Sequence, residues 1–181
     1  YKAVPIFYHQ APAQDDLYAL FRMQARRTRC DLSCAIDLHH RLPVSGRRRR
    51  SLKKAIKAGV EIVEGRQYLP LLWDVLRENL KVKHGAKPVH SLEEILLLVD
   101  RFPDNIRCIC ASLKGQLVAG VVLFVTPTAY HAQYIASCDL GHEISALDFV
   151  FESAVDAAAN HGRRWFDFGI SNEDQGKVLN D

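Results

Sequence analysis

The segment IRCICASLKGQLVAGVVLFVTPTAYHAQYIASC, residues 106–138, decides the fold. It contains three apolar runs that are typical of strands: Ile106 to Leu113, Gln116 to Val125 and Ala129 to Cys138. The two short connections between them contain glycine and proline, which favour tight turns. We therefore expect the three strands to form an antiparallel meander.

The residues after this meander favour one long helix and a further strand. A loop is expected from Asp139 to Glu143, followed by a helix from Ile144 to His161 and a strand from Trp165 to Ile170. Because a helix links the last two strands, we expect a right-handed crossover that makes them parallel. The polar residues from Ser171 onward are typical of the start of a final helix.

The residues before the meander favour a strand and two helices. We expect a strand from Val60 to Val63 and a helix from Gln67 to Lys83, and a capping box at Ser91 to Glu94 predicts a second helix to about Phe102. The order of these elements predicts an α/β chain with a mixed sheet.

The N-terminal part is predicted to contain a helix from Gln14 to Arg27, a strand from Cys30 to Leu38 and a basic helix from about Arg48 to Ala58. The first helix and strand weakly resemble those around Leu147 and Asp167, 130 positions later, although chance is an alternative explanation. The hypothesis is that residues 1–58 are the tail of an earlier, similar half and that residues 59–181 form the main domain.

Composition excludes several classes of protein. The chain has 181 residues, of which 48% are hydrophobic and 25% charged, as in soluble globular proteins. No apolar run is long enough to span a membrane, and the first residues do not resemble a signal peptide. Five cysteines without a CxxC pair and eight histidines without metal-ligand spacing favour a reduced, cytoplasmic protein without a metal site.

The basic residues are concentrated in one segment, which supplies seven positive charges between Arg47 and Lys57. On a helix, Arg47, Arg50, Lys54 and Lys57 share one face, while the apolar residues, Leu52, Ala55 and Ile56, should pack inward. Such a face could bind a phosphorylated acceptor, with a purely solvated surface as the alternative and transfer RNA as a further candidate partner.

Four segments resemble the Fem-like and polysaccharide-biosynthesis branch of the GNAT superfamily of acyltransferases. They are GRRRRSLKKAIKAGV (46–60), PVHSLEE (88–94), YHAQY (130–134) and FDFGISNE (166–173). The resemblance implies a GNAT-like mixed sheet flanked by helices, with residues 1–58 as the remnant of a preceding GNAT-like half. A complete half would add two strands after the final helix, and these are expected to be missing.

The same resemblance implies an activity. The expected reaction is transfer of an acyl group, acetyl first of all, from acetyl-CoA to an amine of an amino sugar or of a cell-wall or polysaccharide precursor. A Fem-like transferase that uses aminoacyl-tRNA is the nearest alternative. A non-catalytic module that binds anions or nucleic acid is the alternative from another class.

The donor phosphates would lie at the start of the long helix, where Gly141, Ser145 and Ala146 are the candidates for cofactor binding. However, the usual Q/R-x-x-G-x-G/A signature is absent, and Asp139 and Glu143 would repel a phosphate. Simple capping of the helix by these acids is the alternative.

The strand from Tyr130 to Ile135 would line the catalytic cleft. Alternation places His131 and Gln133 on one face and Tyr134 on the other. His131 is the candidate base, Tyr134 the candidate acid, and Gln133 completes the predicted catalytic set. Packing in the core is the alternative for both His131 and Tyr134.

Further candidates for substrate binding lie where strands end and helices begin. They are His90, Asp167, Ser171 and Glu173, in addition to Arg47, Arg50 and Lys54. Capping is the alternative for Ser171 and Glu173, and an exposed loop position is the alternative for His90.

Overall fold

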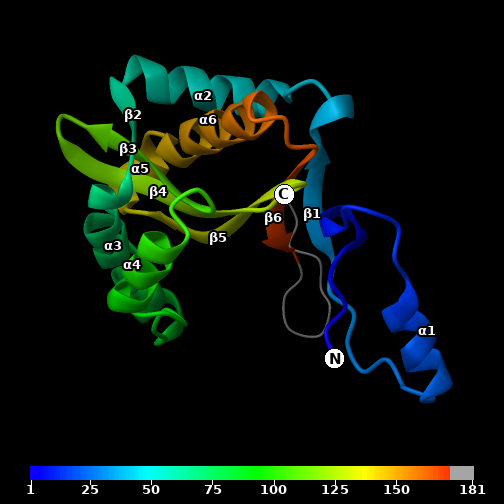
Figure 1. Ribbon diagram of the computed structural model, residues 1–181. Helices are drawn as coiled ribbons and strands as arrows, with labels where there is room; N and C mark the ends of the chain where they lie inside the picture. The colour runs from blue at the N-terminus through cyan, green and yellow to red at the C-terminus, as the bar shows by residue number, and fades with distance from the viewer. Residues whose placement is uncertain (172–181) are drawn as a thin grey trace.

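The computed structural model describes residues 1–171, which form one six-stranded sheet with helices on both faces (Figure 1). The helices are α1 (Asp15–Arg22), α2 (Gly46–Lys57), α3 (Leu69–His84), α4 (Leu92–Arg101), α5 (Asp139–Glu143) and α6 (Ala146–Asn160). The strands are β1 (Ser33–Asp37), β2 (Val60–Glu64), β3 (Ile106–Leu113), β4 (Gln116–Val125), β5 (Ala129–Ser137) and β6 (Trp165–Ile170). Single 3-10 turns lie at Ile6–Tyr8, Leu38–His40 and Arg66–Tyr68.

The strand order is β1-β6-β5-β4-β3-β2, and it confirms the predicted mixed sheet. Strands β2 to β5 are antiparallel to their neighbours in chain order, as expected for a meander with an added strand. The predicted parallel crossover is also confirmed, because β6 runs parallel to β5. Strand β1 then pairs antiparallel with the outer edge of β6.

Two hydrophobic cores lie on opposite faces of the sheet. One core packs α2 and α6 against the sheet and is centred on Val121, Val150 and Phe166. The other packs α3 and α4 against the opposite face, around Leu72 and Trp73. The capping box that opens α4 is present as predicted. Helices thus cover the sheet on both faces.

The connection between β5 and α6 differs from the predicted loop, because residues 139–143 form the short helix α5. Gly141 permits this packing. A Cβ atom there would lie 2.2 Å from the main-chain oxygen of Val118 and 2.5 Å from Oγ of Ser137. The long helix begins at Ala146 rather than at Ile144, since Ser145 adopts a left-handed conformation with φ 60° and breaks the chain between the two helices.

The N-terminal 58 residues contribute to this same sheet through β1 and to its upper layer through α2. Helix α1 projects away from the body and ends at Arg22, shorter than predicted, and none of its residues is buried (Figure 1). In α2, Ala55 is buried as predicted, but the inward position predicted for Ile56 is wrong, since this side chain is 54% exposed. The division of the chain at residue 58 stays a prediction.

The predicted final helix lies outside the described residues. In residues 1–171, no helix combines the length and the apolar composition that a membrane crossing requires.

Candidate active site

A bulge in β5 determines which side chains of this strand share a face. Val122 of β4 pairs with Tyr134, but the next residue of β4, Leu123, pairs with Ala132, so Gln133 is an extra residue without a partner. The bulge breaks the alternation, and the predicted placement of Tyr134 opposite His131 is therefore wrong. Tyr134 packs in the core beneath α3, whereas Tyr130 packs in the core beneath α6, so His131 and Tyr134 share the face that carries α3.

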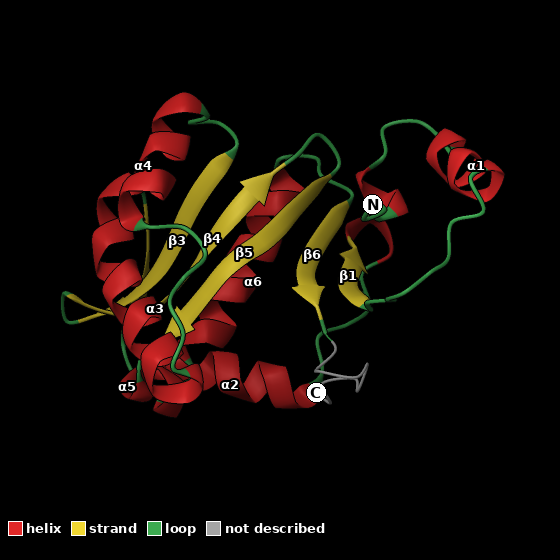
Figure 2. Ribbon diagram, turned by 90° about the horizontal axis from the view of Figure 1, so that it is seen from below, coloured by secondary structure: helices red, strands yellow, loops and turns green. Residues whose placement is uncertain are grey.

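Strands β5 and β6 separate at the residue predicted to be the base. Their parallel pairing covers three positions and ends where His131 pairs with Asp167. Beyond this point β5 continues to Ser137 and β6 to Ile170, and the two strands diverge (Figure 2). The sheet thus opens beside His131.

His131 and Asp167 form a hydrogen-bonded pair at this opening. Nδ1 of the imidazole lies 2.8 Å from Oδ2 of the carboxylate. The Tyr8 hydroxyl donates to the same oxygen at 2.5 Å, and the main-chain N–H of Gly169 donates to Oδ1 at 2.8 Å. Asp167 is only 2% exposed, whereas the side chain of His131 is 26% exposed. The carboxylate is therefore buried, and the imidazole reaches the surface of the opening.

The hydrogen bonds keep Asp167 ionised in spite of its burial. Burial alone would raise the pKa of this carboxyl, but the donors from His131, Tyr8 and Gly169 together hold the pKa below its ordinary value. An ionised carboxylate accepts the proton of Nδ1–H and so leaves the lone pair of Nε2 free on the neutral imidazole. In this tautomer His131 can act as a base through Nε2, which has no hydrogen-bond partner in residues 1–171.

Two contacts hold the Tyr134 side chain against His90 and Trp73. Its hydroxyl forms a short hydrogen bond with Nδ1 of His90, and its ring packs edge-on against Trp73 at a centroid distance of 4.9 Å. Burial raises the pKa of the Tyr134 phenol above its ordinary value. The phenol therefore keeps its proton at neutral pH and can donate it.

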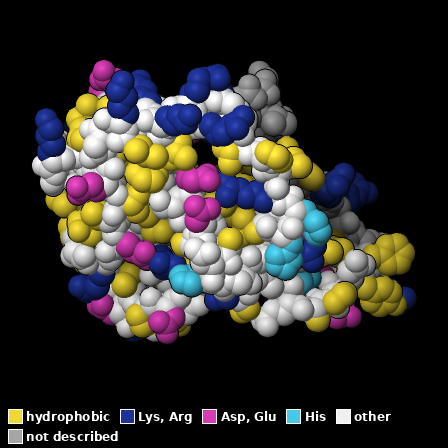
Figure 3. Space-filling model, turned by 90° about the horizontal axis from the view of Figure 1, so that it is seen from above, with side chains coloured by type: hydrophobic (Ala, Val, Ile, Leu, Met, Phe, Trp, Pro, Cys, Tyr) yellow, Lys and Arg dark blue, Asp and Glu magenta, His cyan; other side chains and the backbone are white. Residues whose placement is uncertain are grey.

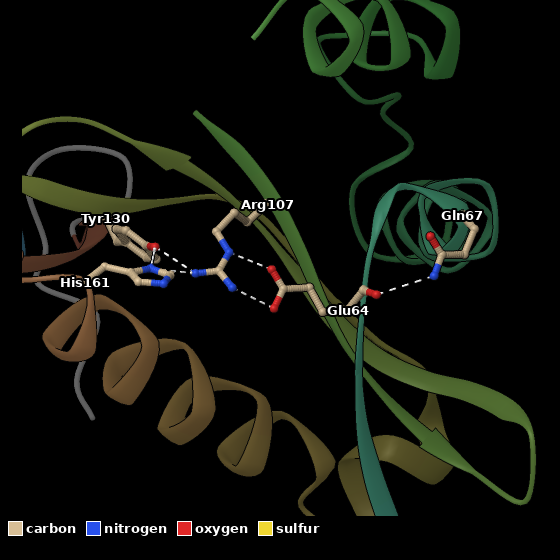
Figure 4. A network of polar contacts seen from close by, with 5 residues as sticks. All are labelled: Glu64, Gln67, Arg107, Tyr130 and His161. Atoms are coloured by element: carbon tan, nitrogen blue, oxygen red, sulfur yellow. Dashed lines mark hydrogen bonds and ion pairs between the residues drawn. The ribbon is translucent and has the colours of Figure 1, made fainter. Parts of the chain in front are cut away.

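A second polar network anchors β5 from the opposite face of the sheet (Figure 4). Arg107 donates to both carboxylate oxygens of Glu64, at 2.5 and 2.7 Å, and to the Tyr130 hydroxyl at 2.8 Å. The Tyr130 hydroxyl also lies 2.5 Å from Nδ1 of His161, at the end of α6. Because Tyr130 precedes His131, this network fixes the strand position from which the imidazole projects.

A cavity of about 700 Å³ lies between α2, α6, β1 and β6, on the face of the sheet opposite His131. Its walls are largely apolar and include Leu52, Phe151 and Phe168. At its rim Arg48 forms a short ion pair with Asp148 in the first turn of α6. Figure 3 shows the row of Lys and Arg side chains along α2 and the hollow beside it. The cavity can thus accept an apolar arm, and its lining carries both cations and carboxylates.

The three basic residues of α2 that were predicted to bind substrate do not line this cavity. Arg47, Arg50 and Lys54 are exposed on α2 and do not line it, whereas Arg48 does. Of the predicted donor-site residues, Gly141 and Ser145 line the cavity, and Ala146 is buried as the first residue of α6. Their predicted role in binding a donor stays a prediction.

A second cavity, of about 710 Å³, lies between α3, α4 and the loop that joins them. It is lined by Trp73, His90 and charged side chains that include Arg77, Lys81 and Glu94. Since His90 also binds Tyr134, this cavity adjoins the β5 face that carries Tyr134. Of the remaining candidates, the main chain of Ser171 donates to Leu32, and Glu173 lies outside the described residues.

Two residues of the site could not be predicted from the sequence. Tyr8 reaches Asp167 across 159 positions, and Arg48 differs from its neighbouring arginines only in the direction of its side chain. Among residues 1–171, no group of three or more His, Cys, Asp or Glu side chains is placed to hold a metal ion.

The chain matches one known family and shares its fold with several solved structures. The family described as Acetyltransferase (GNAT) domain matches residues 44–175. No curated protein matches the chain. The solved structure of FemX superposes with a TM-score of 0.69 at 10% identity, covering 89% of this chain and 61% of FemX. The L-PGS from Bacillus licheniformis superposes with a TM-score of 0.67 at 14% identity, covering 92% of this chain and 53% of L-PGS.

A third solved structure is the C-terminal domain of a lysylphosphatidylglycerol synthetase from Agrobacterium fabrum. It gives a TM-score of 0.59 at 15% identity, covering 78% of this chain and 47% of that one. These likenesses establish a shared fold. The chain spans about half to three fifths of the length of these three structures.

Proposed function

This chain belongs to the GNAT acetyltransferase family, and from that premise we propose that it is an N-acyltransferase with His131 as its base. The observation that carries the proposal is the pair of His131 and Asp167 at the point where β5 and β6 separate. The donor is a CoA thioester, and the acceptor is an amine of an amino sugar or of a cell-wall or polysaccharide precursor.

The cavity between α2 and α6 supports the donor part of this proposal. Its apolar walls suit a pantetheine arm, which would reach His131 through the opening between β5 and β6, and Arg48 at the rim is a cation for the phosphates of CoA. Asp148 pairs with Arg48 and offsets part of the positive charge of this arginine. In the proposal, Ser145 and the first main-chain N–H groups of α6 therefore also donate hydrogen bonds to the phosphates.

The proposed reaction uses both polar side chains on the α3 face of β5. The acceptor nitrogen attacks the thioester carbonyl while Nε2 of His131 takes its proton, so that a carbon–nitrogen bond forms. The carbon–sulfur bond then breaks, and the leaving thiolate takes a proton from the Tyr134 hydroxyl. Asp167 stabilises the imidazolium that forms on His131.

The acceptor is proposed to enter from the cavity beside His90. This cavity carries both acidic and basic side chains, which suit an amine on a sugar that also bears an anionic group. A cytoplasmic location is part of the same proposal, because all five cysteines are free thiols.

The test is acyl transfer measured by release of free thiol from acetyl-CoA, with a panel of amino sugars as acceptors. We expect H131Q to lower kcat by at least 100-fold. The matched control is H39Q, since His39 is exposed and lines neither cavity. Full activity of H131Q would overturn the assignment of the base.

An aminoacyl-tRNA-dependent transferase is the second candidate function. The exposed face of α2 favours it, because Arg47, Arg50 and Lys54 have no ion pair within residues 1–171. Calorimetric titration with acetyl-CoA separates the two candidates, since micromolar binding supports the first. Binding of transfer RNA that weakens steeply with salt, without acetyl-CoA binding, would support the second. Such salt-dependent binding without any acyl transfer would instead indicate a non-catalytic module.

A further inference from the structure

The N-terminal segment contacts the catalytic pair although it lies far from it in sequence. Tyr8, in the 3-10 turn Ile6–Tyr8, places its hydroxyl 2.5 Å from Oδ2 of Asp167. The Tyr8 ring meets the His131 ring edge-on, with centroids 6.4 Å apart. This tyrosine precedes the range 44–175 that matches the family.

A second aromatic contact fixes the segment on β6. Phe7 packs against Trp165 with ring centroids 5.7 Å apart, and it also packs against Tyr8 at 4.7 Å. The turn itself is closed by the hydrogen bond from the Tyr8 N–H to the Pro5 carbonyl. The position of the Tyr8 hydroxyl is therefore set by packing on the strand that carries Asp167.

The hydrogen bonds that Asp167 accepts indicate that Tyr8 restrains the orientation of its carboxylate. The Gly169 N–H holds Oδ1, and the Tyr8 hydroxyl holds Oδ2 while that oxygen also binds Nδ1 of His131. With donors on both oxygens, the carboxylate cannot turn away from the imidazole without losing a buried hydrogen bond. Burial and the bond to Asp167 raise the pKa of Tyr8, so the phenol remains a donor at any working pH.

We propose that Tyr8 is a positioning residue of acyl transfer, which holds the Asp167 carboxylate against His131 and makes the N-terminal segment part of the active site. This inference rests on the proposed function, in which His131 is the base. The tyrosine does not touch the substrate, and it acts only through the carboxylate.

The substitution Y8F tests the proposal because it removes one hydroxyl and keeps the ring. We expect kcat to fall about 10-fold, with the KM for acetyl-CoA changed less than twofold. The acid limb of the kcat–pH profile should move to higher pH by several tenths of a unit. Without the phenol, more of the carboxylate charge acts on His131 and favours the imidazolium.

The matched control is Y1F. Tyr1 lies in the same segment and also donates to an aspartate at 2.5 Å, but its partner, Asp16, lies on α1, away from the sheet (Figure 1). Y1F should keep the wild-type kcat and pH profile. The melting temperature of each variant shows whether it is folded under the assay conditions.

A second measurement does not depend on turnover. The Nδ1 proton of His131, observed by NMR in the wild-type chain, should change its chemical shift in Y8F and not in Y1F. Wild-type kcat, pH profile and proton shift in Y8F would overturn the inference, as would a loss of kcat with an unchanged profile and shift. If H131Q is inactive while Y8F behaves as wild type, only the role of Tyr8 fails. An active H131Q refutes the proposed base instead.

Discussion

Replacing Asp167 by asparagine should separate the charge of this buried side chain from its size. Three donors surround the carboxylate: Nδ1–H of His131, the hydroxyl of Tyr8 and the N–H of Gly169. An amide has one acceptor oxygen, so in D167N at least one donor meets the NH₂ group. The least costly arrangement turns the amide oxygen to His131 and Tyr8 and leaves Gly169 unpaired. This should lower the free energy of unfolding at pH 7 by about 1–3 kcal/mol.

The same substitution removes the charge that stabilises the imidazolium during proton transfer. We expect kcat to fall by on the order of 100-fold, in the range found when a residue that orients a functional histidine is replaced. Thiol release from acetyl-CoA measures this effect, and urea unfolding followed by tryptophan fluorescence measures stability. A D167N variant that keeps kcat within threefold of the wild type would refute the role of the pair.

The stabilising effect of Asp167 should depend on pH in one defined direction. The pKa of Asp167 is held below its ordinary value in the folded chain, so its stabilising effect is fully present above about pH 4. The effect is lost as the pH falls through the lower pKa of the folded state. The stability difference between wild type and D167N should therefore narrow in acid, and a difference that stays constant from pH 7 to pH 3 would contradict the reasoning.

Three other substitutions test separate parts of the structure. G141A should lower the free energy of unfolding by about 2–4 kcal/mol in urea, because its Cβ would meet the main-chain oxygen of Val118 at 2.2 Å. R48A should weaken acetyl-CoA binding about 10-fold in calorimetry, since it removes the cation at the rim of the cavity between α2 and α6. R107M should lower the free energy of unfolding, measured by thermal melting, by about 2–4 kcal/mol, because the Tyr130 hydroxyl loses the donor Arg107 and Glu64 loses its ion-pair partner.

Each of these variants has a matched control. G46A adds a Cβ whose nearest contact is 3.5 Å away, R49A removes an exposed arginine of the same helix, and R101M removes an exposed arginine of α4. All three controls should stay close to wild type. Equal effects in a variant and its control would show that the assigned contact is not the cause.

The sequence predicted the meander, the crossover and the capping box because each depends on local patterns. Residues 106–138 alternate between apolar runs and turn residues, and Ser91 and Glu94 have the spacing of a reciprocal cap. Such signals need only neighbouring residues. Helix α1 was predicted less well, because none of its residues is buried, and it ends at Arg22. The inward position predicted for Ile56 was also wrong, since this side chain is exposed although Ala55 beside it is buried.

Only part of the candidate site could be predicted from local sequence patterns. His131 stood out as a polar residue in an apolar strand, but its pairing with Asp167 depends on the parallel register of β5 and β6. The bulge at Gln133 turned Tyr134 to the face of His131, which strict alternation cannot foresee. Tyr8 joined the site by packing on β6 from a remote segment. The sequence thus determined the elements, since these follow local periodicity, while tertiary packing alone decided which side chains meet, since register and close approach belong to the folded chain.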